Sequence, residues 1–168
     1  MMTTEENVAN IVSATELMDH WQGHRRLTRK LIELFPEEHF YTFSIGGMRP
    51  CSELMMELIV MAAPGAQGLV TGNWQTEDQL AVDFSAKAPS TKAEVLAMWD
   101  RSTEQMNAVW PQIRPERFQE SDAAFGVYAN KVIYSLFYFI DNEVHHRGQA
   151  YVYLRALGIE PPAFWDRA

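Results

Sequence analysis

The sequence predicts an all-α protein built as an antiparallel four-helix bundle. Apolar residues recur at spacings of three and four along four separate segments, and two of these segments begin with a capping box. Each segment is followed by a proline or a glycine, the residues that most often end helices. No repeat or linker-like stretch divides the 168 residues, so residues 1–168 are expected to form a single domain.

Two of the predicted helices carry a capping box at their start. The first covers residues 13–35, where Ser13 is followed three residues later by Glu16. The third opens in the same way with Thr91 and Glu94 and ends before a proline. In such a box the hydroxyl and the carboxylate each satisfy a backbone N–H group that the first turn leaves unpaired. The starts of these two helices are therefore strong local predictions.

The other two predicted helices rest on proline and glycine signals. The second begins at Pro50, because proline suits a first helical turn. Pro64 and Gly65 are expected to bend or interrupt this helix, since proline cannot donate the hydrogen bond that continues it. The fourth covers about residues 129–157, and Gly158 marks its end.

The connections between the helices differ in length. Alternating apolar residues over 80–84 fit a short edge strand or a loop. The polar stretch 114–126 is expected to be irregular. Because several connections are too long for tight hairpins, the sequence does not predict a simple up-and-down order.

Composition and charge exclude several classes of protein. The formal net charge is −8, which argues against a nucleic-acid partner. The apolar runs are shorter than the roughly 20 residues of a membrane span, so no membrane association is expected. With one cysteine the chain forms no internal disulfide, and we expect a cytoplasmic protein.

A polar stretch, NEVHHRGQ at residues 142–149, lies inside the apolar fourth segment. The apolar seam of this helix, continued through the stretch, selects Asn142, Glu143, His146 and Gln149. Side chains three and four residues apart can direct two ligand atoms at one point, as in the metal sites of helical bundles. The seam therefore predicts a polar pocket or part of a metal site. His145 lies to one side of this apolar seam.

A second carboxylate lies on the apolar stripe of the second predicted helix. Glu57 sits between Leu54 and Met61 at helical spacing, and a buried charge there needs a partner or a metal. An ion pair with one of three arginines, Arg25, Arg49 or Arg147, is the alternative to metal binding. In the first predicted helix, His20 and His24 lie four residues apart and are by themselves typical of structural histidines.

Other residues of note are interpreted as structural. The aromatic residues of the fourth helix (Tyr134, Phe137, Tyr138, Tyr151 and Tyr153) are interpreted as ordinary packing. Gly148 is expected to let another helix approach closely. Cys51, at the start of the second helix, is a weak candidate nucleophile, because a helix dipole can lower a thiol pKa.

The string HHRGQ, followed by YLRALGIEPP, resembles the last helix of the DinB/YfiT-like superfamily. The LFPEE turn and the SELMMELI segment resemble earlier parts of the same fold. This superfamily includes bacillithiol transferases and mycothiol-dependent maleylpyruvate isomerases. The resemblance implies a four-helix bundle, a homodimer, and a divalent metal held by three histidines at one end of the helices.

The sequence departs from that pattern at two of the three implied ligands. Glu57 and Asn142 stand where the resemblance has histidines, and only His146 is kept. The metal-ligand set to test is therefore Glu57, Asn142 and His146, with Ni, Zn, Mn or Fe as the ion. Oxygen-rich donors shift the preference toward harder ions such as Mg²⁺ and Mn²⁺. A hydrogen bond between Glu57 and His146 can also satisfy the site without an ion.

Two functions follow as hypotheses. The first is a metal-dependent thiol S-transferase or small-molecule hydrolase that uses a low-molecular-weight thiol or water, with Glu143, His145 or His24 as proton-transfer candidates. The alternative is a non-catalytic dimeric bundle whose degenerate metal site binds a small ligand or a protein. A ferritin-like di-iron centre is excluded, because only one Glu-x-x-His pair, Glu143 with His146, is present.

Overall fold

The computed structural model describes residues 11–75 and 89–168. Within these ranges the chain is mostly helical. The elements in chain order are α1 (Ala14–Leu34), α2 (Glu37–Phe40), α3 (Cys51–Thr71), α6 (Lys92–Val109), the 3₁₀ helices η1 (Trp110–Gln112) and η2 (Pro115–Gln119), β1 (Ser121–Ala124), β2 (Tyr128–Lys131) and α7 (Val132–Ala156). The predicted all-α bundle is confirmed. The stretch 80–84, for which the sequence left an edge strand or a loop open, lies outside the described residues.

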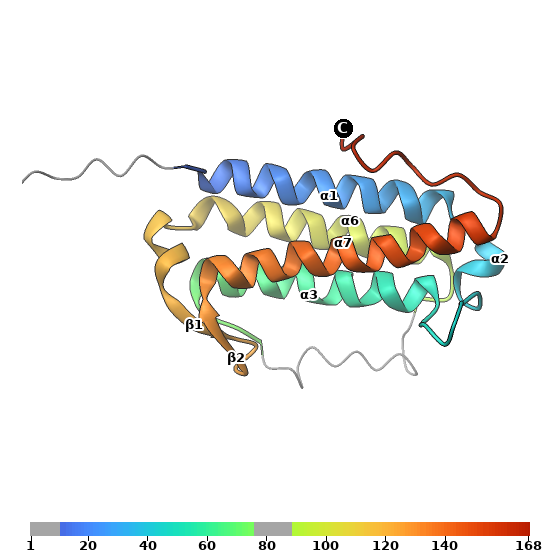
Figure 1. The fold of residues 1–168 in the computed structure, drawn as a ribbon. Coiled ribbons are helices and arrows are strands. Elements are labelled where there is room, and N and C mark those ends of the chain that lie inside the picture. Colours follow the sequence, from blue (N-terminus) through green and yellow to red (C-terminus); the bar gives the residue numbers. More distant parts are fainter. Residues whose placement is uncertain (1–10, 76–88) are drawn as a thin grey trace, which may run out of the picture.

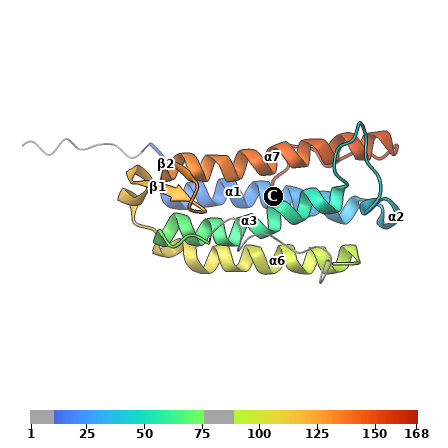
Figure 2. The same cartoon turned by 90° about the horizontal axis from the view of Figure 1, so that it is seen from below.

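The four long helices lie side by side in a ring in which α1 contacts α6 and α7, and α3 contacts the same two helices (Figures 1 and 2). Helices α1 and α7 run in one direction and α3 and α6 run in the other (Figure 1). The adjacent pairs α1/α6 and α3/α7 are thus antiparallel, the adjacent pairs α1/α7 and α3/α6 are parallel, and the order is up, down, down, up (Figure 1). The β1–β2 hairpin lies at one end of the bundle, and α2 lies at the other (Figure 2).

Local capping signals set the helix starts. Ser13 caps α1 and Thr91 caps α6, each with the reciprocal bond from Glu16 or Glu94 that completes the capping box. Pro50 is the N-cap of α3 and lies just outside the helix that it was expected to open. All three signals depend on residues close in the chain, which explains why the sequence located these starts.

Helix α3 continues through Pro64, so the expected interruption at Pro64 and Gly65 is wrong. A proline in a helix interior leaves one carbonyl unbonded, yet α3 packs against both α6 and α7, and this burial outweighs the lost bond. Gly65 has a packing role, because a Cβ there would lie 2.8 Å from the ring of Phe139. The helix ends at Gly72, whose positive φ of 73° forms a left-handed cap.

The connection between α6 and α7 is ordered, in contrast to the irregular stretch that was expected. It forms two 3₁₀ turns and the antiparallel hairpin, in which Ser121 pairs with Lys131 and Ala124 with Tyr128. Helix α7 therefore begins at Val132 and not near residue 129. Arg117 ties this region to the bundle, since its guanidinium donates to the carbonyls of Gly68 and Leu69 at the end of α3.

Helix α3 is the most apolar helix of the bundle. Among the described residues it is the one helix whose length and hydropathy would suit a membrane span, and 61% of its apolar window is buried inside the structure. The buried side chains of α3 contribute to two apolar clusters, one toward the hairpin end and one toward α2. An apolar helix buried in this way is what the centre of a bundle requires.

Candidate functional site

The predicted polar residues of α3 and α7 come together in one hydrogen-bonded network. Glu57 lies on α3, and Asn142, His146 and Gln149 lie on the facing side of α7. The loop after α2 adds Arg49, whose backbone carbonyl accepts a hydrogen bond of 2.8 Å from the buried Tyr153 hydroxyl. Because Tyr153 anchors the loop, the position of Arg49 beside Glu57 is set by the bundle.

Both carboxylate oxygens of Glu57 are bonded to protein donors. The Oε1 atom is 3.0 Å from Nε2 of His146 and accepts from Nδ2 of Asn142 at 3.1 Å. The Oε2 atom accepts from Nη2 of Arg49 at 2.6 Å. Of the alternatives that the sequence left open for Glu57, the ion pair with Arg49 is present. Glu57 remains partly accessible, with 26% of its side chain exposed.

His146 lies between two acceptors. Its Nε2 atom faces the Glu57 carboxylate, and its Nδ1 atom is 2.8 Å from Oε1 of Gln149. The Gln149 amide nitrogen is directed toward the sulfur of Met48 at 3.6 Å. Each ring nitrogen therefore has a polar partner, and the imidazole is held between α3 and α7. The network thus places Arg49, Asn142 and His146 around one carboxylate.

These partners hold Glu57 in its ionised form. Hydrogen bonds from His146, Arg49 and Asn142 lower the pKa of the Glu57 carboxyl to about 2, although burial acts in the opposite direction. The interaction with His146 is the largest cause of the lower pKa. A carboxyl whose pKa is depressed by folding stabilises the folded state above its ordinary pKa and loses this contribution as the pH falls toward 2. At neutral pH the carboxylate is therefore charged and paired.

The residues present do not fit a three-ligand metal centre. Asn142 turns its amide N–H toward Glu57, and a donor hydrogen cannot coordinate a cation. Arg49 carries a positive charge on the carboxylate oxygen that a divalent ion would need. Within residues 11–75 and 89–168, no group of three or more histidine, cysteine or acidic side chains is placed to hold an ion. Of the three predicted ligands, Glu57 and His146 are the two that keep a ligand-type atom directed into the site.

Glu143 does not join this network, although it neighbours Asn142 in the chain. It is 1% exposed and points toward α1, where its carboxylate accepts from the Thr28 hydroxyl at 2.7 Å and from the Trp21 indole at 3.3 Å. Arg147 lies 3.8 Å away on the same helix. Burial raises the pKa of Glu143, while Arg25, Thr28, Arg147 and Trp21 act to lower it. Glu143 and Asn142 both line one small cavity, but Glu143 makes its hydrogen bonds with α1 and not with the Glu57 network.

His24 belongs to the same second cluster and is also enclosed. Its Nδ1 atom is 2.8 Å from Nη2 of Arg147, which can only donate, so Nδ1 is the acceptor. The proton of the neutral ring is then on Nε2, which faces Nε2 of His20 at 3.3 Å. Burial, together with Arg147, Arg167 and His20, lowers the pKa of His24 to about 3. His24 is thus a neutral structural residue at pH 7.

Arg25, on α1, is the next member of this second cluster, and its side chain contacts α6. Its guanidinium is stacked 4.0 Å over the ring of Trp99 and donates to the Thr103 hydroxyl at 3.0 Å. Burial lowers the pKa of Arg25 to about 10. Together with Arg147 it supplies the positive charge near Glu143.

Several other predicted roles do not agree with the structure. His145 is exposed on the outer face of α7, away from the Glu57 network. Cys51 is fully buried, and burial raises the pKa of its thiol, so it is a poor nucleophile. Outside α7 itself, a Cβ on Gly148 would meet no described atom within 4 Å, so no other helix of the described residues approaches it. Of the aromatic residues interpreted as packing, Tyr153 is buried, but Tyr134, Phe137 and Tyr138 are largely exposed.

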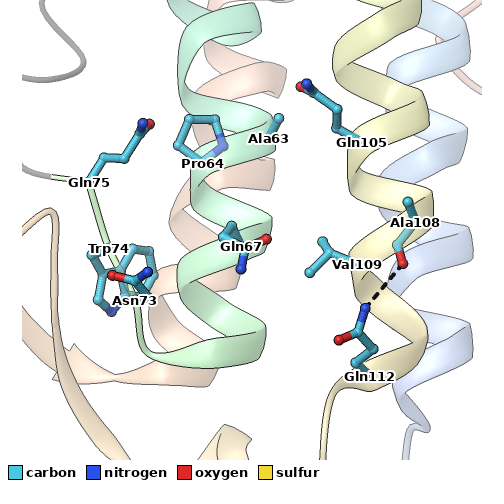
Figure 3. A pocket seen from close by; sticks show the side chains of 10 residues that line it. All are labelled: Ala63, Pro64, Gln67, Asn73, Trp74, Gln75, Gln105, Ala108, Val109 and Gln112. Carbon is cyan, nitrogen blue, oxygen red and sulfur yellow. Dashed lines mark hydrogen bonds between the residues drawn. The ribbon is translucent and has the colours of Figure 1, made fainter.

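A large groove of about 1060 Å³ lies on the opposite side of α3, against α6 (Figure 3). Figure 3 shows that Gln67 on α3 faces Gln105 on α6 and Gln112 in η1 across it. Asn73 and Gln75 add further amides, and no acidic, basic or histidine side chain is among the described residues that line it. The described lining of this groove therefore offers no group for acid–base chemistry, and among the described residues the Glu57 network is the better candidate site.

The fold and this site define a helical-bundle protein with a carboxylate–imidazole pair between its third and last long helices. The model of the DinB family matches residues 2–167, and the chain belongs to the DinB family. It is similar to the uncharacterized protein YjoA of Bacillus subtilis (strain 168), with 22% identity over 156 residues that cover 92% of this chain and 97% of that protein.

Two crystal structures share the fold. One is the DinB-like protein YjoA from Bacillus subtilis, with a TM-score of 0.67 and 21% identity over 88% of this chain and 96% of that one. The other is a DinB-like protein from Bacillus cereus ATCC 10987, with a TM-score of 0.69 and 14% identity over 89% and 95% of the two chains. At these identities the likeness supports the bundle architecture and does not extend to the site.

Proposed function

We propose that this DinB-family protein is a non-catalytic binding module for a small molecule, and that its Glu57 network works without a metal ion. The observation that carries the proposal is the saturation of Glu57 by protein donors, with Arg49 at 2.6 Å on one oxygen and Asn142 and His146 on the other. Arg49 provides the positive charge that a metal would otherwise supply. A buried carboxylate needs such a charge in either case.

Arg49 also gives the network a way to exchange partners. Its side chain is 47% exposed, whereas the side chain of Glu57 is 26% exposed. A ligand with its own hydrogen-bond donor can therefore replace Arg49 on Glu57 from the solvent side, while Asn142 and His146 hold the carboxylate in place. Such an exchange costs little, because ion pairs at partly exposed positions contribute only up to about 1 kcal/mol.

A metal-dependent thiol S-transferase or small-molecule hydrolase is the second candidate. The observation in its favour is that Glu57 and His146, an oxygen and a nitrogen donor of types that bind divalent metals, lie 3.0 Å apart. A bound Ni, Zn, Mn or Fe ion would supply an activated thiol or water. Stoichiometric metal together with turnover of a low-molecular-weight thiol and an electrophile would favour this candidate over the binding module.

Metal analysis of the untagged protein tests the proposal. We expect the wild-type protein to carry far less than one ion per chain after purification and after incubation with Zn²⁺, Ni²⁺ or Mn²⁺. The positive control is the double variant Glu57→His/Asn142→His, which restores with His146 the three-histidine set that the family resemblance implies. This variant should bind about one Zn²⁺ or Ni²⁺ per chain, because three imidazoles form a suitable centre.

The opposite result would be equally clear. Stoichiometric metal in the wild type, lost in both Glu57→Ala and His146→Ala, would overturn the metal-independent site. Asn130→Ala is the matched surface control, because Asn130 is exposed on the hairpin and has no contact with Glu57. Loss of metal in that variant as well would point to nonspecific binding.

We also propose that the protein is a homodimer, as the family resemblance implies. The outer face of α7 exposes Phe137, Val144 and Val152, which lie on one side of the helix. Exposed apolar surface of this kind is a common contact surface between protein copies. Light scattering at micromolar concentration should give twice the chain mass of 19.3 kDa. The variant Val144→Glu/Val152→Glu should be a monomer, and a monomeric wild type would refute the dimer.

A further inference from the structure

A second, partly open cavity lies at the hairpin end of the bundle, apart from the Glu57 network. Its volume is about 350 Å³, within the range of small-molecule pockets. The hairpin and the first two turns of α7 form its walls. The lining residues are Ala124, Phe125, Tyr128, Ala129, Asn130, Tyr134, Ser135, Tyr138 and Phe139. We call this cavity the aromatic pocket.

Aromatic rings form both the mouth and the floor of the aromatic pocket. Tyr128, Tyr134 and Tyr138 are each about half exposed, whereas Phe125 and Phe139 are buried. The two phenylalanine rings meet edge to face, with centroids 5.8 Å apart and an angle of 74° between their planes. Phe139 in turn stacks on Trp21 of α1 at 5.8 Å. The floor is therefore a rigid surface of ring faces and edges.

The hairpin turn has a strained backbone conformation at Phe125, whose ring forms part of the pocket floor. Phe125 has a φ of +55°, and among the described residues it is the one non-glycine position with a positive φ. Gly126 follows with a φ of 76°, and the Val127 N–H closes the turn on the Ala124 carbonyl at 3.1 Å. Such turns favour glycine or asparagine at both central positions. Phenylalanine is disfavoured there, and its ring is nevertheless fully packed against Phe139 and Trp74.

The chemistry of the lining indicates what the pocket can hold. None of the described lining residues carries a charge, so a charged ligand would lose its hydration without gaining a partner. A flat ring can pack against the faces and edges of Phe125, Phe139 and the tyrosines, which favour offset-stacked and edge-to-face contacts. Tyrosine hydroxyls and Ser135 offer hydrogen bonds for one polar substituent.

We propose that the aromatic pocket binds a small, planar, uncharged aromatic molecule. The inference adds to the proposed binding function, because it names the chemical class of one ligand. It rests on the proposed function in one respect, that the protein binds small molecules. Tyr138 and Asn142 lie four residues apart on the same side of α7, about 6 Å along the helix axis. A substituent on the ring can therefore point toward the Glu57 network.

Three related probes test the class of ligand on the full-length protein. They are 1-naphthol, its saturated analogue decahydro-1-naphthol, which is not planar, and 1-naphthoate, which is charged at neutral pH. Saturation-transfer NMR and titration calorimetry should show saturable binding of 1-naphthol. Affinity for the other two probes should be at least about tenfold weaker, because one lacks aromatic contacts and the other brings an unpaired charge.

Variants locate the binding site. Tyr134→Ala and Tyr138→Ala should each raise the Kd of 1-naphthol by roughly 3- to 10-fold, the range expected for loss of one aromatic contact. Both residues are largely exposed, so these variants are expected to fold. Phe164→Ala is the control, because Phe164 is an equally exposed aromatic residue in the C-terminal tail and does not line the pocket. It should change the Kd by less than about twofold.

Several results would overturn the inference. They are the absence of saturable 1-naphthol binding at millimolar concentration, an equal effect of Phe164→Ala, and equal affinity for 1-naphthoate. A Kd that rises with protein concentration would show that a second copy of the chain covers the pocket, and would also overturn it. Metal content is measured separately, so a metal-binding wild type with intact 1-naphthol binding would refute the Glu57 proposal alone.

Discussion

Replacing Glu143 with alanine is expected to lower the free energy of unfolding by about 3 to 5 kcal/mol. The reason is that the carboxylate is fully enclosed between α1 and α7 and compensates the buried guanidinium of Arg147 and, at longer range, that of Arg25. Its removal also leaves the Trp21 indole without its acceptor, whereas the Thr28 hydroxyl keeps the His24 carbonyl at 3.1 Å. Urea unfolding followed by circular dichroism measures the change.

Two further variants make this prediction specific. Asp141→Ala removes a carboxylate two residues earlier on the solvent side of α7 and should change stability by no more than about 0.5 kcal/mol. Glu143→Gln keeps an acceptor oxygen and most of the volume, so its loss should be smaller than that of Glu143→Ala. If Glu143→Ala lost less than about 1 kcal/mol, or if Asp141→Ala lost as much, the buried cluster would not be an important source of stability.

Replacing Gly68 with alanine is expected to destabilise the protein by about 1 to 3 kcal/mol, the usual cost of overpacking. A Cβ at this position of α3 would lie 2.0 Å from the Cε3 atom of the Trp74 ring. The ring would have to move, and it would lose its contact with Phe125, at 5.6 Å between centroids. Urea unfolding gives the loss, and tryptophan fluorescence should shift to longer wavelength as Trp74 becomes more exposed.

Gly148→Ala is the matched control, because it is the same substitution in the interior of a long helix. Among the described residues, no atom outside α7 lies within 4 Å of a Cβ at Gly148, and alanine restricts the unfolded chain more than glycine does. We therefore expect a gain of up to about 1 kcal/mol at low micromolar protein concentration. Equal changes for the two glycines would mean that the close approach of Trp74 does not matter.

Local chemistry made the helix starts predictable. The capping boxes at Ser13 and Thr91 involve residues three apart, so the interaction exists wherever that segment forms a helix. The start of α7 was placed about three residues too early, because the short strand β2 before it carries no strong alternation of apolar and polar residues. Pairing with β1 decides that stretch, and a hairpin partner cannot be inferred from weak patterns.

Helical periodicity predicted that Glu57, Asn142 and His146 would meet, and the structure places them within hydrogen-bond distance. Helical periodicity did not predict the partners of Glu143, because Glu143 lies about 100° further around α7 than Asn142. That difference separates the side that faces α3 from the side that faces α1. Which helix occupies each side depends on the order of helices around the bundle, and spacing along one segment contains no information about that order.

The sequence by itself determined the helix-bundle fold, the limits of α1 and α6, and the pairing of a carboxylate on α3 with the polar stretch of α7. These features follow from short-range spacing, capping and the cost of burying a charge. Only the tertiary structure decided that Arg49 takes the second oxygen of Glu57, that Glu143 joins His24 and Arg147, and that α3 continues through Pro64. Those outcomes depend on contacts between distant segments, whose energies outweigh local preference once the helices pack.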